Sequence, residues 1–119
     1  MPREYPRALR LAEQIHRDLA QLVSREIKDP RVGMITIEEV EVSPDLSHAK
    51  VYYTLFADQG DPVETQAGLD RAKGFLRSRL GKALRVRFTP ELHFIYDETA
   101  EKAKDLEALI AKARAKDEH

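Results

Sequence analysis

The spacing of the apolar residues changes several times along this chain, and these changes constrain the fold more than any other feature of the sequence. From Pro6 to about Lys28 the apolar residues recur every three or four positions, which predicts an amphipathic helix. Residues 34–42 and 48–56 are instead rich in β-branched and aromatic side chains, and the sequence between them is typical of a turn. We therefore predict a helix followed by an antiparallel hairpin.

The first strand of this hairpin carries an irregularity in its apolar pattern. Ile37 and Val40 are both apolar, although their positions differ in parity and would point to opposite faces of a regular strand. One extra residue at Glu38-Glu39 would return both side chains to the same face. We predict a β-bulge at this step.

A second helix is predicted to begin at Asp61. Its side chain can cap the first turn, Pro62 suits the first helical position, and Glu64 completes a capping box. The apolar residues that follow form one stripe, which Phe75 does not fit. We predict that a break or kink at Ala72-Lys73-Gly74 turns Phe75 inward; the alternative is an ordinary straight helix with an exposed phenylalanine.

The last third of the chain predicts one more strand and one more helix. Pro90 is tolerated at the start or edge of a strand, so we place the third strand mainly after it, over residues 92–96. Either Asp97 or Thr99 can cap the last helix.

Length and composition limit the class of protein. The 119 residues are enough for one domain, which we place at 1–112, followed by a flexible charged tail at 113–119. The sequence has no cysteine, which excludes disulfides, thiolate nucleophiles and cysteine-based zinc sites. No segment approaches the roughly 20 apolar residues that a bilayer requires. We expect a monomeric, cytoplasmic protein with no membrane partner.

The charge is balanced overall but unevenly distributed. The net charge is −1, yet residues 73–88 hold six cations and no acid, whereas residues 32–72 hold two cations and eight acids. A local cluster of cations suits phosphate binding, because each neutralised phosphate releases counterions. The alternative is a solvated helix face with no partner.

The predicted order of elements is helix, strand, strand, helix, kink, helix, strand, helix. This order gives an α+β fold with helices on one face of a small sheet, and it matches the type II KH arrangement. KH domains clamp single-stranded RNA with a GXXG loop. The five glycines of this chain never lie three residues apart, so that loop is missing and we do not expect ordinary KH binding.

Several short motifs follow one another between about Arg7 and Ile110, and together with the alanine-x-glycine kink they are specific. They are Asp29-Pro30-Arg31, Ile35-Thr36-Ile37, Val40-Glu41-Val42-Ser43, Asp45-Leu46-Ser47 with Ala49 and Val51-Tyr52, Arg77 with Leu80, and the closing run Arg85, Arg87, Pro90, Leu92, Phe94 and Asp97. In this order and spacing the chain resembles the ribosome-binding factor A family of bacterial small-subunit assembly factors.

The resemblance implies a KH-like fold in which the kink replaces GXXG. It also implies binding to the immature or free small ribosomal subunit and its ribosomal RNA, and a role in late processing of that RNA, often prominent in the cold. It implies no catalysis. An assembly GTPase is a further candidate partner.

Position in this KH-like frame selects the candidate RNA-binding residues. Arg10 and Arg17 form a second candidate patch, and Arg87 either joins the first patch or pairs with an acid in the sheet. Ala72 and Gly74 are expected to be structural and to permit a close backbone approach at the kink. The candidate phosphate contacts of the first patch are Lys73, Arg77, Arg79, Lys82 and Arg85.

The sequence predicts no cofactor and no metal site. Its histidines lie on four different predicted elements without metal-ligand spacing, so we interpret each as a surface or hydrogen-bonded histidine. These histidines are His16, His48, His93 and His119.

Three acids of the hairpin leave two alternatives to RNA binding open. A solvated strand edge explains Glu38, Glu39 and Glu41, but the same acidic face could serve as a protein-interaction module. A small hydrolase that uses Glu38 or Glu41 would have to show turnover that is lost when they are replaced.

Overall fold

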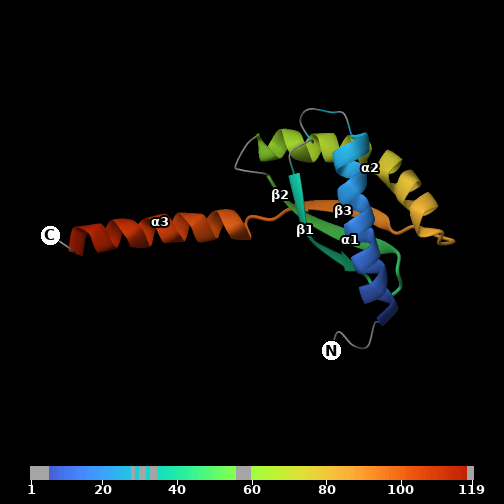
Figure 1. The fold of residues 1–119 in the computed structure, drawn as a ribbon, viewed down its shortest axis with the longest axis horizontal. Coiled ribbons are helices and arrows are strands. Elements are labelled where there is room, and N and C mark those ends of the chain that lie inside the picture. The colour runs from blue at the N-terminus through green and yellow to red at the C-terminus, as the bar shows by residue number, and fades with distance from the viewer. Residues whose placement is uncertain (1–5, 28, 30–31, 33–34, 56–59, 118–119) are drawn as a thin grey trace.

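The computed structural model describes residues 6–27, 29, 32, 35–55 and 60–117 and contains three helices and three strands in these ranges (Figure 1). This is the α+β fold expected from the sequence. The Asp29-Pro30-Arg31 turn falls largely outside the described residues. In chain order the elements are α1 (Pro6–Glu26), β1 (Ile35–Val42), β2 (His48–Leu55), α2 (Pro62–Leu84), β3 (Glu91–Tyr96) and α3 (Thr99–Asp117).

The three strands form one mixed sheet in the order β1-β2-β3. β1 and β2 are antiparallel, which confirms the hairpin, and their register shifts between Ile37 and Glu39, which confirms the β-bulge. The bulge brings Ile37 and Val40 onto the same buried face. β3 pairs with β2 in parallel, so the chain between these strands must cross over the sheet.

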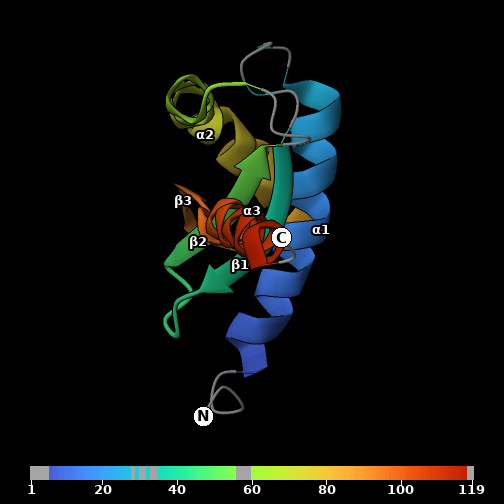
Figure 2. The same cartoon turned by 90° about the vertical axis from the view of Figure 1, so that its left-hand side faces the viewer.

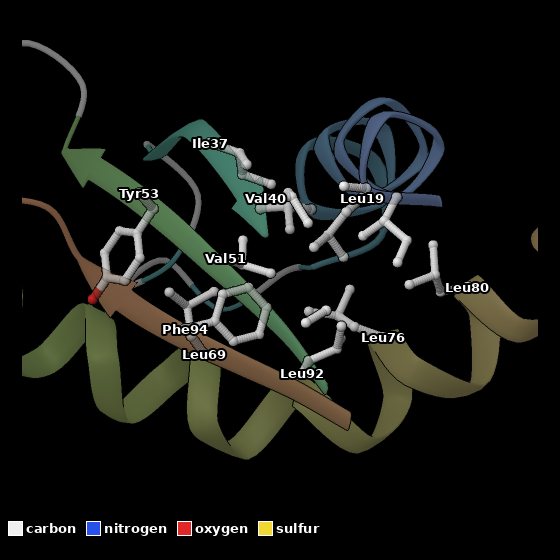
Figure 3. Packing of buried hydrophobic residues seen from close by; sticks show 14 of the residues in the cluster. Leu19, Ile37, Val40, Val51, Tyr53, Leu69, Leu76, Leu80, Leu92 and Phe94 are labelled. Carbon is white, nitrogen blue, oxygen red and sulfur yellow. The ribbon is translucent and has the colours of Figure 1, made fainter. Parts of the chain in front are cut away.

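The helices α1 and α2 cover one face of this sheet (Figure 2). Alternate residues of β2 show which face is covered, because Val51 and Tyr53 are fully buried whereas His48 and Lys50 are exposed. Between the helices and the sheet lies a single apolar core (Figure 3). It includes Ile15 and Leu19 from α1, Leu69, Leu76 and Leu80 from α2, and Leu92 and Phe94 from β3.

A partly buried polar contact ties α2 to both β2 and β3. The Tyr53 hydroxyl donates to Gln66 Oε1 at 2.7 Å, and Gln66 Nε2 donates to the carbonyl oxygen of Phe94 at 2.8 Å. Burial raises the pKa of Tyr53 to about 12, so the hydroxyl stays a donor at neutral pH. The pair therefore fixes the beginning of α2 over β2 and β3.

The beginning of α2 is the one that the sequence predicts. Asp61 has an extended backbone and its side chain accepts a hydrogen bond from the Val63 amide at 2.9 Å, while Pro62 occupies the first helical turn. The helix ends at Arg85, which adopts the left-handed conformation with φ 56° and donates its amide to the Gly81 carbonyl at 3.1 Å.

The prediction that Phe75 turns inward is wrong, because its side chain is 43% exposed. Helical structure also continues from Pro62 to Leu84 without a break at 72–74. The first and last parts of α2 run in different directions in Figure 1, in agreement with a bend between them, and its place at Ala72-Lys73-Gly74 stays a prediction. Leu76 and Leu80 fill the core below, which leaves Phe75 on the outside.

The helix α3 extends away from the rest of the protein (Figure 1). Asp97 caps it, because its carboxylate accepts the Thr99 amide at 2.9 Å. The radius of gyration is 17.4 Å, compared with about 13.5 Å for a compact domain of this length. Helical structure reaches Asp117, so residues 113–117 are helical, and the flexibility of the tail stays a prediction. Within the described ranges, no helix is long and apolar enough to cross a membrane.

The turn between β1 and β2 generates a prediction about acid stability. Asp45 Oδ1 accepts the hydroxyls of Ser47 and Ser43, each at 2.7 Å, and the Ser47 amide at 3.1 Å, and these bonds lower the pKa of Asp45 to about 2. Since the folded pKa lies below the unfolded one, the carboxylate stabilises the fold above about pH 4 and loses this effect as the pH falls toward 2. We expect the carboxyl carbon resonance of Asp45 to titrate near pH 2.

The variant Ser47→Ala removes the largest of these contributions and should move the Asp45 midpoint upward. In Asp45→Asn, the free energy of unfolding should depend less on pH between 4 and 2. An Asp45 midpoint at the ordinary value of about 3.9 in the unsubstituted protein would contradict this description of the turn.

Candidate nucleic-acid interface

The cation-rich segment, residues 73–88, occupies the second half of α2 and most of the loop that leads into β3. Five of its six cations are exposed, and Lys73 is half-buried. The segment contains no side-chain carboxylate. Leu76 and Leu80 pack its helical part against the apolar core. The second half of α2 and the loop after it thus expose five cations and have no acid of their own.

Arg77 and Arg79 are held by contacts inside the protein. Arg77 donates from Nε and Nη2 to the carbonyl oxygen of Thr89, at 3.1 and 2.8 Å, and so fastens the loop to α2. Arg79 Nε lies 3.3 Å from Glu26 Oε2 at the end of α1, in a partly exposed ion pair. Both guanidinium groups remain exposed to solvent, but their orientation is set by the fold rather than left free.

Lys82 and Arg85 are the most available cations of the first patch. Both are exposed, and neither forms an ion pair with another residue that the structure describes. Arg85 occupies the left-handed end of α2. Among the described residues, neither side chain has an ion pair to break before it approaches a phosphate.

Two exposed phenylalanine rings lie against arginines of the segment, a contact that was not predicted from the sequence. The Arg87 guanidinium lies 5.6 Å from the centre of the Phe88 ring, and Arg79 lies 5.3 Å from that of Phe75. Phe88 is 78% exposed. Arg87 therefore stacks on an aromatic neighbour instead of pairing with an acid of the sheet. The adjacency of Arg87 to Phe88, and the helical spacing from Phe75 to Arg79, were the available signals.

The second candidate patch is separate from the first. Arg10 and Arg17 are exposed and lie on the side of α1 opposite to its buried stripe, as their spacing of seven residues predicts. The side of α1 that faces α2 carries Asp18, Arg25 and Glu26, which line a pocket with Ala83. This side of α1 therefore carries both signs of charge.

The two glycines in the second half of α2 have opposite surroundings. A Cβ atom placed on Gly74 would meet nothing within 4 Å, whereas one on Gly81 would lie 2.5 Å from Thr89 Oγ1. Gly81 thus permits the loop to fold back on the helix. Among the described residues no group lies close to the Cβ position of Gly74, and the close backbone approach expected at the kink stays a prediction.

The other sequence-predicted residues are placed as follows. Ala72 of α2 is half-buried and packs against the apolar core, and Glu38, Glu39 and Glu41 are exposed along β1. His16 donates from Nε2 to the carbonyl oxygen of Ile37 at 2.8 Å, as expected of a hydrogen-bonded histidine. His119 lies outside the described residues.

Comparison with known proteins identifies relatives over most of the chain. A family model described as ribosome-binding factor A matches residues 7–110. The ribosome-binding factor A of Delftia acidovorans is 56% identical over 107 residues, which cover 90% of this chain and 85% of the relative. That of Thioalkalivibrio sulfidiphilus is 52% identical over 117 residues, covering 98% and 91%.

Solved structures agree with these matches. The crystal structure of ribosome-binding factor A from Thermus thermophilus superposes with a TM-score of 0.66 at 30% identity, covering 75% of this chain and 94% of that one. A homology model of the Thermus thermophilus factor, fitted into a cryo-electron microscopy map of its complex with the 30S subunit, gives a TM-score of 0.62 at 30% identity, covering 72% and 90%.

The contrast between the two glycines predicts opposite effects of the same substitution. Gly74→Ala should raise the free energy of unfolding by about 1 kcal/mol, because alanine favours a helix and the site has room. Gly81→Ala should lose this gain, and should destabilise the protein if Thr89 and the loop cannot move away. Urea unfolding of both variants checks the prediction. Equal effects at the two positions would contradict the packing described for the loop.

Proposed function

The chain belongs to the ribosome-binding factor A family, and from this premise we propose that it binds the small ribosomal subunit through ribosomal RNA and assists late processing of that RNA. The partner is inferred from the Thermus thermophilus relative that was fitted into a 30S complex. The contact surface is inferred from the cations of this chain. We propose that the protein acts as a monomer in the cytoplasm, with an assembly GTPase as a candidate second partner.

The observation that carries the proposal is the exposure of the cation-rich segment. A solvated helix face usually carries both signs of charge, whereas residues 73–88 hold six cations and no acid. Lys82 and Arg85 have no acid in ion-pair contact among the described residues. Each phosphate that such a cation neutralises releases counterions and so contributes to affinity without requiring a particular base.

The arrangement suits binding rather than chemistry. The cation-rich segment contains no carboxylate or imidazole that could act as a general acid or base. We propose that the protein binds one conformation of the maturing RNA better than its competitors and shifts the population toward it. Binding weakens when maturation removes that conformation, so no bond needs to be made or broken by this chain.

The fixed arginines have a role of their own in this proposal. Arg77 connects the loop to α2 through Thr89, so the backbone that carries the loop cations is held close to the helix. A preorganised set of cations loses less conformational entropy on binding than a set of free side chains. Lys82 and Arg85 then make the phosphate contacts, while Arg77 serves the architecture and contacts phosphate with its remaining donors.

The first test measures how salt affects binding to purified 30S subunits. For roughly four to six neutralised phosphates, a plot of log affinity against log salt should have a slope of about −3 to −5. Lys82→Gln should make this slope less steep by about one and weaken binding, because one phosphate contact is lost. Arg10→Gln tests the second patch in the same way, because it should also make the slope less steep if Arg10 contacts a phosphate.

Lys50→Gln is the matched control, because Lys50 is an exposed cation on the sheet face away from the helices. It should leave the slope unchanged. A different result would be an affinity for 30S subunits that is unchanged by salt and by Lys82→Gln but falls when Glu39 and Glu41 are replaced by glutamine. This result would favour the acidic hairpin as a protein-interaction surface.

A second test uses the open surface at Gly74. If RNA backbone approaches the kink closely, Gly74→Ala should weaken binding to 30S subunits while the free protein becomes more stable. The opposite changes in the two measurements separate contact from misfolding. Unchanged affinity in this variant would remove Gly74 from the proposed interface and leave the cations as its basis.

A further inference from the structure

The parallel pairing of β2 and β3 brings together two histidines that are far apart in the sequence. His48 is opposite Glu91 in the register, and His93 follows Glu91 two residues later on the same face of β3. His48 Nδ1 lies 2.9 Å from His93 Nε2, and 3.8 Å from Glu91 Oε2. One donor atom from each of the three side chains lies within 4.8 Å of the other two.

We propose that His48, His93 and Glu91 bind a divalent transition metal ion of the Zn²⁺ type. Two imidazole nitrogens and one carboxylate oxygen form a ligand set that Zn²⁺ uses in open sites, with the fourth position left to water. At bond lengths of about 2.0 to 2.2 Å, tetrahedral ligand atoms are about 3.3 Å apart. The separations of 2.9 and 3.8 Å lie on either side of this value and the third is within 4.8 Å, so side-chain rotations that bring Glu91 closer would complete the site.

The position of the three side chains favours binding from solution. His48 and Glu91 are each 52% exposed at the side chain, so an ion can enter without any opening of the fold. The ligands stand on paired strands, whose backbone hydrogen bonds fix the direction of each side chain. Without a metal, one of these two ring nitrogens donates a hydrogen bond to the other, and both must be free of hydrogen to coordinate a metal ion.

The proposed site is independent of RNA binding. It lies on the sheet face away from α1 and α2, whereas the cation-rich segment lies on α2 and the loop after it. Lys50 is next to the site in the register, opposite His93, and its charge opposes binding of a cation. The affinity for the metal therefore rests on direct coordination and not on a general negative field.

The test is a calorimetric titration of the full chain, free of any affinity tag, with ZnCl₂ at pH 7.5. We expect one ion per chain, and at least about tenfold weaker binding in His48→Ala and in His93→Ala. Glu91→Gln should weaken binding by a smaller factor. In a parallel NMR titration the imidazole resonances of His48 and His93 should shift, while those of His16, which bonds to Ile37, should not.

Glu41→Gln is the matched control, because Glu41 is an exposed acid on the same sheet and is opposite Lys50. It should leave the affinity unchanged. The proposal is overturned if the chain binds no Zn²⁺, if both histidine variants bind as well as the unsubstituted protein, or if Glu41→Gln weakens binding as much as they do. Circular dichroism of the variants verifies that each one is folded.

Discussion

The parallel pairing of β2 with β3 is the constraint on which the rest of the structure depends. Two parallel neighbours require a crossover connection, and α2 with its two flanking loops supplies it. The crossover places the second half of α2 and the following loop outside the sheet, where the cations are exposed. The same pairing aligns His48 with Glu91 on the opposite face. The proposed RNA-binding surface and the proposed metal site thus both follow from the parallel pairing of β2 with β3.

The crossover is stable because each of its parts is fixed by a different kind of contact. Leu69, Leu76 and Leu80 bury the underside of α2, and Gln66 joins its beginning to Tyr53 and Phe94. At the far end, the loop is held by Arg77 on Thr89, in the space that Gly81 leaves open. A cation in this segment can therefore be structural and still contribute its charge to the surface.

The parts of the fold that the sequence predicts are those set by local chemistry. The parity of Ile37 and Val40 predicts the bulge, and Asp61 predicts the beginning of α2, because each signal lies within a few residues of its effect. Contacts between distant segments leave no such signal. No spacing rule links His48 to His93, because tertiary pairing alone unites them. Helical periodicity placed Phe75 off the apolar stripe, as the structure has it; the error was to expect a kink at residues 72–74 to turn this apolar side chain inward.

The extension of α3 away from the domain affects how the molecule behaves in solution. The protein measures 64 × 39 × 18 Å along its principal axes, and such an elongated particle diffuses more slowly than a sphere of 13.6 kDa. Gel filtration calibrated with globular standards would therefore assign this chain too large a mass and could mistake a monomer for a dimer. Light scattering or sedimentation equilibrium, which do not depend on the outline of the particle, are the appropriate measures of its oligomeric state.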